Sequence, residues 1–439
     1  MSTGLLGDEL PHLITDVPGP RSRALTDRLA RVESPNITAI EPAPICWTEA
    51  RGAAVRDADD NIFIDLTAGF GVAHAGHAND AVAAAIADQA ARLAHGLGDV
   101  YPPEPKVRLL ERLAAIAPGD LSMTILAGSG AEAVEAALKT AVVRSGRTGI
   151  LAFEGAYHGL TYGALATTWR SDFRARFSAQ LFDGVRFAPY PITGTAAPSL
   201  EAVDRIIADA EASPHPIGAI IVEPVLGRGG LHVPPDGFLT ALRERCDGDR
   251  TLLILDEVYT GCGRTGRWFA CEHEGVVPDV LVVGKALSGS LPISAAIGTP
   301  PVMRAWPVST GEAIHTSTFL GNPIACAAAL AQLDAIQNGD LLRRAERLGE
   351  AIREKTTSWA MRFDDVGPPR GCGLLQGAPM RGAGQALRVA DRCLRRGVLL
   401  LAEGTAAEVL AITPPAVITE AQLDFALAVV EESIRAELE

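Results

Sequence analysis

Short apolar runs alternate with segments of helical periodicity through the middle of the chain. Six runs read as strands, at residues 123–127, 150–153, 217–222, 252–255, 280–283 and 293–297. Amphipathic stretches of helical period lie between several of them, at residues 131–143, 200–212 and 237–246. Continuous apolar strands separated by helices predict an α/β fold with a mostly parallel sheet that helices cover on both faces.

The pattern changes after about residue 330, where longer helical segments surround short apolar runs. These segments lie at residues 341–355, 385–396 and 420–438. Such a mixture is typical of a smaller α+β domain, to which we expect the start of the chain to contribute. The expected division is an N-terminal segment of the small domain at 1–66, a large domain at 67–328, and the C-terminal part of the small domain at 329–439.

Charge and composition narrow the classes of partner. The 39 Lys and Arg residues against 53 Asp and Glu residues give a net charge of −14, which argues against a nucleic-acid backbone as ligand. No apolar run approaches the roughly 18 residues of a membrane-spanning helix. The seven cysteines form no CxxC pair, and no secretory signal is visible at the N-terminus. We therefore expect a cytoplasmic protein with reduced thiols that binds neither membrane nor nucleic acid.

Ligands of α/β sheets lie at the carboxyl ends of the strands, which draws attention to Lys285. The chain has four lysines, and three of them occupy charged helical contexts. Lys285 instead ends the apolar run VLVVG and enters the turn ALSGSLP. An ammonium group beside apolar sequence tends to have a lowered pKa, as a lysine that forms a Schiff base requires. The alternative is an ordinary lysine whose stem covers apolar surface.

Asp256 directly follows another apolar run, in TLLILDE. A carboxylate in this position is costly without a facing cation or donor, and a protonated pyridine nitrogen is one such partner. The alternative is a turn-capping aspartate.

Residues 261–266, GCGRTG, match the dinucleotide pattern GxGxxG. That pattern must join a strand directly to a helix. Here it neither follows its strand directly nor opens a helix, so nucleotide binding is disfavoured.

A helix start after the first strand offers a site for a phosphate group. Ser129, Gly130 and Ala131 stand between the run MTILA and the helical segment. Small residues let the backbone approach an anion, and the first amides of a helix are free to bind it. Ser129 can equally cap the helix, with Glu132 completing a capping box, and the two roles are compatible.

An aromatic turn and a histidine pair complete the candidates. Tyr157 and His158 follow the strand GILAF, where an aromatic ring can stack on a planar cofactor or simply pack in the turn. His74 and His77 form an HxxH pattern without a third ligand nearby, which favours a glycine-rich turn over a metal site.

Taken together, these segments resemble the class III (ω-amino acid:α-keto acid) aminotransferases, which bind pyridoxal phosphate on fold type I. The resemblance covers nearly the whole chain. The matching segments are GSGAEAVEAALK at 128–139, FEGAYHG at 153–159, VEP at 222–224, LDEVYTGCGRTG at 255–266, GKALSGSLPISA at 284–295 and HTSTFLGNPIACAAAL at 315–330.

The resemblance implies a role for each matching residue. Lys285 would form the Schiff base and later carry the proton, and Asp256 would keep the pyridine nitrogen protonated. Thr318 would reach the phosphate of the neighbouring subunit, which implies a homodimer. The remaining residues implied to bind the cofactor are Ser129, Gly130 and Ala131 at the phosphate, Tyr157 and Val258 on the two ring faces, and His158, Glu223 and Tyr259.

Three positions depart from the pattern common in the family. Tyr259 replaces a glutamine, and its phenol can still donate to the cofactor's ring oxygen. Arg228 stands where many members have a glutamate, and Ala411 stands where many have the arginine that this glutamate covers. We hypothesise that Arg228 has taken over carboxylate recognition, since an arginine fork suits a carboxylate. The alternative is that Arg228 faces solvent and that the site takes an amine without a carboxylate, such as an amino sugar.

The sequence therefore predicts a cytoplasmic, homodimeric pyridoxal-phosphate-dependent aminotransferase. It would move a primary, terminal amino group between an amine donor and an aldehyde or α-keto acid by a ping-pong mechanism. Phe70 is expected to line the amine pocket, on the resemblance alone. The alternatives are an aminomutase or decarboxylating transaminase of the same fold and, in another class, an NAD-dependent oxidoreductase.

Overall fold

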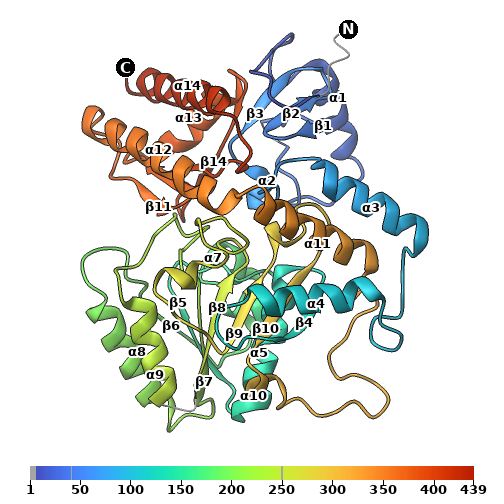
Figure 1. Cartoon of the computed structure of the whole chain (residues 1–439). Helices are drawn as coiled ribbons and strands as arrows, with labels where there is room; N and C mark the ends of the chain where they lie inside the picture. Colours follow the sequence, from blue (N-terminus) through green and yellow to red (C-terminus); the bar gives the residue numbers. More distant parts are fainter. Residues whose placement is uncertain (1–5, 41, 249–250) are drawn as a thin grey trace.

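A computed structural model describes residues 6–40, 42–248 and 251–439 of the chain. Figure 1 shows one large sheet wrapped by helices in the lower body of the molecule. The first strands and the last helices gather at the upper end, so segments far apart in the sequence lie side by side there.

The large sheet has seven strands and confirms the predicted α/β class. Strands β5 to β9 pair with one another in parallel. Strand β10 runs antiparallel to both of its neighbours, β4 and β9. In spatial order the strands are β4 (Met123–Ala127), β10 (Ser294–Gly298), β9 (Val280–Val283), β8 (Leu252–Glu257), β7 (Ile217–Val222), β5 (Gly149–Phe153) and β6 (Val185–Ala188).

Successive residues of the central strands enter two different cores. In β8, Leu253 and Leu255 belong to the larger core, whereas Leu252 and Ile254 pack in a second core with residues of α5 (Gly130–Ser145). Side chains alternate between the faces of a strand, so both faces of the sheet are covered. This arrangement explains why these strands are continuously apolar in sequence.

Helices of the large body lie close to their predicted positions. The predicted segments at 200–212 and 237–246 correspond to α8 (Ala197–Ala210) and α9 (Phe238–Gly248). The other helices up to residue 338 are α2 (Ala68–Gly71), α3 (Asp80–Arg92), α4 (Glu104–Ile116), α6 (Tyr162–Thr167), α7 (Ser171–Arg174), α10 (Pro300–Met303) and α11 (Pro323–Asn338), with 3₁₀ turns η1 (Ala175–Gln180), η2 (Ala270–His273) and η3 (Lys285–Leu287).

The upper end of the molecule holds two small four-stranded sheets. One contains β1 (Trp47–Arg51), β2 (Ala54–Asp57), β3 (Ile62–Asp65) and β13 (Val398–Leu399), and the other β11 (Arg370–Cys372), β12 (Leu375–Pro379), β15 (Val409–Ile412) and β14 (Leu401–Glu403). Helices α12 (Leu341–Arg362), α13 (Gln385–Leu394) and α14 (Glu420–Leu438) pack with them. Because β3 pairs with β13, the N-terminal and C-terminal segments share a sheet.

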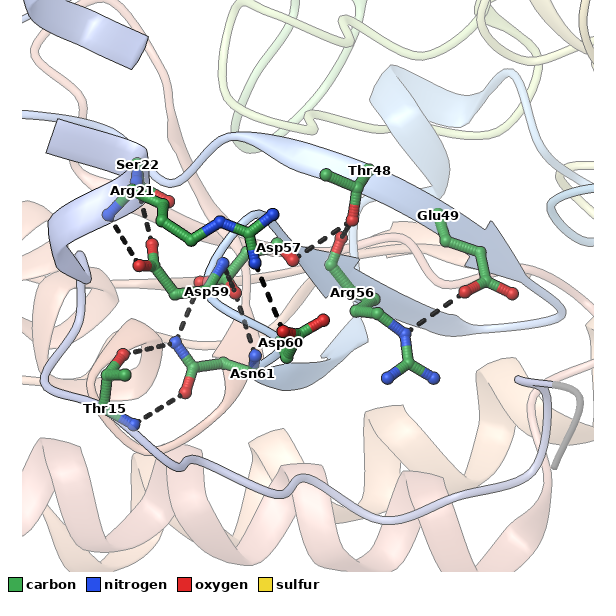
Figure 2. A network of polar contacts seen from close by, with 10 residues as sticks. All are labelled: Thr15, Arg21, Ser22, Thr48, Glu49, Arg56, Asp57, Asp59, Asp60 and Asn61. Atoms are coloured by element: carbon green, nitrogen blue, oxygen red, sulfur yellow. Dashed lines mark hydrogen bonds and ion pairs between the residues drawn. The ribbon is translucent and has the colours of Figure 1, made fainter. Parts of the chain in front are cut away.

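Polar contacts fasten the N-terminal helix α1 (Pro20–Leu29) to the turn between β2 and β3 (Figure 2). The Asp59 carboxylate accepts hydrogen bonds from the amides of Arg21 and Ser22, at 2.7 and 2.8 Å, and so caps the first turn of α1. The Asn61 side chain accepts from the Thr15 amide at 3.0 Å. These contacts hold the start of the chain on the small domain, away from the large sheet.

No helix among residues 6–40, 42–248 and 251–439 is long and apolar enough to cross a membrane.

Candidate active site

A cavity of about 360 Å³ opens where the strands of the large sheet end. Four strands each deliver side chains to it from the residues at or just beyond their carboxyl ends, and the start of α5 forms one wall. The lining residues are Gly130, Ala131, Tyr157, His158, Gly159, Leu160, Glu223, Arg228, Asp256, Val258, Tyr259 and Lys285. The structure thus brings most of the residues singled out in the sequence to one place.

Lys285 begins the 3₁₀ turn η3 that follows β9, and its backbone is in the left-handed region with φ of 35°. Such a conformation is unfavourable for a residue with a Cβ atom and persists only where the surrounding structure imposes it. The Nζ atom lies 3.9 Å from the centroid of the Tyr259 ring. The pKa of the Lys285 amine is lowered to about 8, chiefly by burial and in smaller part by Arg228, although Asp256, Glu223 and Glu403 oppose the shift. A neutral, nucleophilic amine is therefore accessible near neutral pH.

Asp256 is buried at the end of β8, with one carboxylate oxygen for each of two partners. One oxygen accepts from the Val258 amide at 3.1 Å, which is the turn-capping contact considered as an alternative. The other lies 2.7 Å from Nδ1 of His158. The second ring nitrogen of His158, Nε2, is buried and has no hydrogen-bond partner within the described part of the chain. Asp256 thus combines a structural contact with a carboxylate placed in the cavity.

Glu223 follows β7 and holds two loops of the cavity in place. Its carboxylate accepts from the Tyr157 amide at 2.8 Å and from the Gly227 amide at 3.0 Å. The pKa of Glu223 is raised to about 7, chiefly by burial and in smaller part by Asp256, although nearby His158 opposes the shift. The Tyr157 amide belongs to a residue of the cavity wall, and the Gly227 amide directly precedes Arg228. Glu223 therefore fixes both the Tyr157 ring and the loop that carries Arg228.

The helix start at Ser129 is built as predicted, with one difference. The Ser129 hydroxyl accepts from the Glu132 amide at 3.2 Å and caps α5. The Glu132 carboxylate, however, accepts from the Gly128 amide at 2.8 Å, so the predicted capping box is displaced by one residue. Gly130 and Ala131 are the first residues of α5, and their amides have no preceding helical turn to bond with. This leaves them available to an anion.

Two glycines let the cavity wall pack closely. A Cβ atom on Gly130 would lie 3.0 Å from the side chain of Val258. Gly159 has φ of 130°, and a Cβ there would lie 2.6 Å from the Cβ of Ala131. The helix start, the residue after Asp256 and the aromatic turn therefore meet only because side chains are absent at these points.

Tyr259 lies next to Lys285 and is buried. Cβ atoms added to Gly71 or Gly227 would lie 2.5 and 2.6 Å from its ring, so the ring fills a slot between these two glycines. Burial and the Glu403 carboxylate raise the pKa of Tyr259 to about 12. The phenol is therefore protonated and is able to donate a hydrogen bond.

Arg228 lies in the cavity lining and is surrounded by aromatic rings. Its guanidinium carbon is 4.9 Å from the ring centroid of Tyr157, 5.8 Å from that of Phe173 and 6.0 Å from that of Phe70. These distances are typical of cation–π contacts. Its Nε atom lies 3.8 Å from the Glu403 carboxylate. Tyr157 and Phe70, both named from the sequence, thus contact the same cation.

Phe173 and Glu403 were missed in the sequence. Phe173 sits in the short helix α7, where RSDFR carries no distinguishing signal. Glu403 ends β14 of the small domain and is only 4% exposed. A glutamate inside an otherwise apolar stretch, LLLAEG, was the one available signal for it.

Thr318 is not among the residues that line the cavity of this chain. It is exposed in the long segment between α10 and α11, and Figure 1 shows this segment (gold) extending away from the body. Its predicted role in a neighbouring subunit remains a prediction.

The glycine-rich segments form turns. His77 pairs with Asp65 at 2.8 Å, and His74 is buried. Among the residues that the structure describes, no three His, Cys, Asp or Glu side chains are placed to hold a metal ion. The GCGRTG segment leads into turns and η2 rather than directly into a helix. Its Arg264 is fully buried and donates to the Pro414 carbonyl at 2.7 Å, so this segment links the two parts of the chain.

The lowered pKa of Lys285 predicts how the rate of its reaction with an aldehyde depends on pH. Because the neutral amine is the nucleophile, its reaction with an aldehyde should accelerate about tenfold per pH unit up to about pH 8 and level off above it. Uptake of pyridoxal phosphate by the cofactor-free protein, followed by visible absorbance between pH 6 and 10, measures this rate. A midpoint near pH 10, as for an exposed lysine, would contradict the assigned environment.

Comparisons with known proteins agree with this site. The family model for class-III aminotransferases matches residues 38–434. The chain is 39% identical to the acetylornithine aminotransferase of Methanopyrus kandleri, over 90% of this chain and 95% of that one. It superposes on the ornithine aminotransferase of Toxoplasma gondii, a structure with partial occupancy of pyridoxal phosphate, with a TM-score of 0.84, 29% identity and 94% of each chain covered. A pyridoxal-phosphate-bound amine transaminase from an uncultivated Pseudomonas species gives a TM-score of 0.84 at 28% identity, over 93% of this chain and 98% of that one.

The chain belongs to the class-III aminotransferase family, of pyridoxal-phosphate fold type I. It is an enzyme that transfers an amino group between an amine donor and a keto acceptor, and its cofactor is pyridoxal 5′-phosphate. The cavity fits this cofactor chemically. It holds a lysine of lowered pKa, a buried carboxylate and the free amides of a helix start, which match an aldehyde, a pyridine nitrogen and a phosphate.

Proposed function

We propose that the cavity residues hold the cofactor in the roles that their chemistry suggests. Lys285 would bind its aldehyde carbon, Asp256 its ring nitrogen, and Tyr157 and Val258 its two ring faces. The cofactor supplies an electron sink that makes a proton next to the amino group easy to remove. The residues proposed to bind the phosphate are Ser129, Gly130 and Ala131. Those proposed for the remaining contacts with the cofactor are His158, Glu223 and Tyr259.

The side chains of this protein would then perform the proton transfers and the positioning. The Lys285 amine, neutral near pH 8, would take a proton from the carbon that carries the amino group and return it one position away. His158, bonded to Asp256 at 2.7 Å, would hold that carboxylate in orientation. Half-reactions with donor and then acceptor in the same cavity amount to a ping-pong cycle.

The donor that the site supports best is an ω-amino acid whose carboxylate binds Arg228. The observation that carries this proposal is the position of Arg228 in the cavity lining, beside the Tyr157 ring and on the same cavity as Lys285. A guanidinium fork matches a carboxylate. The relatives are named for acetylornithine and ornithine, and both compounds carry a carboxylate.

A second candidate is an amine without a carboxylate, such as an amino sugar. The observation that favours it is Ala411, a buried alanine where many members of the family carry the carboxylate-binding arginine. The aromatic rings around Arg228 would then contact the body of the substrate. An aminomutase remains a variant of the same chemistry, and it would release no free keto acid.

Replacing Arg228 with alanine separates these candidates. We expect the KM for carboxylate-bearing donors, such as 4-aminobutyrate, to rise about 10- to 100-fold, because a hydrogen-bonded charge pair is lost. The KM for carboxylate-free diamines should change by about threefold or less, well below that range. Arg228→Lys is the matched control, since it keeps the charge without the fork and should fall between the two. Unchanged KM values for the carboxylate donors would refute this role and leave the second candidate.

A homodimer in the cytoplasm is also part of the proposal. Large apolar side chains in the segments that precede α4 and α11 are exposed in the single chain and would be covered by a second copy: Leu97, Val100, Tyr101, Val308, Ile314 and Phe319. Cysteines without disulfides in the described chain suit a reducing compartment. Sedimentation of the purified chain at about twice 46.0 kDa would support the dimer.

A further inference from the structure

Arg228 and Glu403 form a pair of opposite charges at the edge of the active-site cavity. The Nε atom of Arg228 lies 3.8 Å from a Glu403 oxygen, close enough for attraction but too far for a hydrogen bond. The Gly404 amide donates to the Arg228 carbonyl at 3.2 Å, which fastens the end of β14 beside the Arg228 loop. The two side chains are therefore held near each other by the backbone and not by their own contact.

Both members of the pair lack hydrogen bonds that a buried charge normally has. The Nε atom of Arg228 is buried without a partner in the described residues. Glu403 is 4% exposed, and within the described chain its carboxylate accepts no hydrogen bond and pairs only with Arg228, at 3.8 Å. A buried ion pair offsets the loss of hydration only when further hydrogen bonds satisfy its atoms. The pair thus places an unpartnered buried donor on Arg228 beside a carboxylate to which no described residue donates a hydrogen bond.

The neighbouring strand offers no cation that would neutralise Glu403 in another way. Across the small sheet, Glu403 pairs with Val409 in β15, and Ala411 stands farther along the same strand. Burial raises the pKa of the Glu403 carboxyl, whereas Arg228, Lys285 and Arg170 lower it. Arg228 and Lys285 line the cavity, whereas Arg170 is already paired with Asp172, so the cations that act on Glu403 from the cavity are Arg228 and Lys285.

From this geometry we infer that Arg228 and Glu403 together form a subsite for a zwitterionic head group. Arg228 would bind the carboxylate and Glu403 the ammonium of an α-amino acid end, while the amine at the other end of the substrate reacts at Lys285. The inference rests on the proposed function of Arg228 and adds a substrate class to it: α,ω-diamino acids, in preference to simple ω-amino acids.

The preference follows from the charges alone. A lone carboxylate that binds Arg228 also comes next to the Glu403 carboxylate, and two like charges in a partly buried site repel each other. A zwitterionic end brings an ammonium group to Glu403 and removes that repulsion. It also supplies the acceptor that Arg228 lacks and the donors that Glu403 lacks. One ligand would thereby complement both charges of the pair.

Ornithine and 5-aminopentanoate test this inference, because they differ only in the α-ammonium group. The holoenzyme should use ornithine with a kcat/KM about 10- to 100-fold higher, the value of a hydrogen bond between charged groups. In Glu403→Gln the ratio should fall to about threefold or less, through a loss for ornithine and a gain for 5-aminopentanoate. Both donors are measured on one preparation, so the ratio does not depend on the folded fraction.

A binding readout and a control complete the design. In the Lys285→Ala background, calorimetric titration should show the same order of affinities for the two compounds without turnover. Glu354→Gln removes a charge from the exposed face of α12 and should leave the ratio unchanged. Equal use of both donors by the unaltered enzyme, or a preference for ornithine that survives in Glu403→Gln, would overturn the inference.

Two results distinguish a failure of this inference from a failure of the proposed function. If Arg228→Ala weakens both donors while Glu403→Gln leaves their ratio at its original value, Arg228 binds the carboxylate and the zwitterion subsite is wrong. If Arg228→Ala affects neither donor, the proposed role of Arg228 fails, and the inference about Glu403 fails with it.

Discussion

The Lys285→Ala variant should lose transamination by at least about 10³-fold, the largest effect expected of any single change in this chain. Lys285 combines two tasks: it attaches the cofactor and it carries the proton. Alanine supports neither task. The visible absorbance of the bound cofactor should shift as well, because the covalent attachment is lost. Turnover measured with a coupled assay and an absorbance scan of the same sample check both expectations.

The control for this variant is Lys139→Ala. Lys139 is exposed on α5 and contacts His315, outside the cavity lining, so its removal should leave turnover and absorbance unchanged. Retention of full activity in Lys285→Ala would show that the cavity described here is not where the chemistry takes place.

The second large effect is expected for Asp256→Asn, with turnover reduced by about 10²- to 10³-fold. Asparagine keeps the size and the amide-capping contact of the aspartate, but it removes the negative charge that a protonated ring nitrogen needs in a buried site. The contact with His158 Nδ1 also loses its charge assistance. Single-turnover kinetics with a saturating donor isolate the proton-transfer step.

Asp424→Asn serves as the matched control, because Asp424 is exposed on α14 and the change removes the same charge far from the cavity. If Asp256→Asn retained turnover within about threefold, well below the effect expected of a catalytic charge, its carboxylate would be a turn cap alone.

The central sheet and the polar residues at its edge could be predicted because both follow from local patterns. Strands β7, β8 and β9 are buried on both faces, so their sequences are continuously apolar and the charged residue that ends each run is conspicuous. Asp256 and Lys285 were predicted on that basis, together with the helix start at Ser129. Parallel neighbours in one sheet bring such strand ends together without further information.

Other parts of the structure depend on contacts that sequence periodicity does not record. Strand β6 was not predicted, because it is an edge strand and alternates apolar residues with the exposed Arg186. Helix α12 continues to Arg362, beyond the predicted end at 355, because Trp359 is buried in the core. Glu403 reaches Arg228 only because β14 packs beside the loop that carries Arg228, more than one hundred residues away in the chain.

Reduction of the holoenzyme with borohydride, followed by peptide mapping, tests the central claim most directly. The treatment makes the link between the cofactor and its lysine permanent, and the chain offers only Lys106, Lys139, Lys285 and Lys355 as sites. The pyridoxyl mass should appear on the peptide that contains Lys285 and on no other. Its presence on another lysine, or its absence from every peptide of a protein that has bound pyridoxal phosphate, would contradict the assignment of this cavity as the active site.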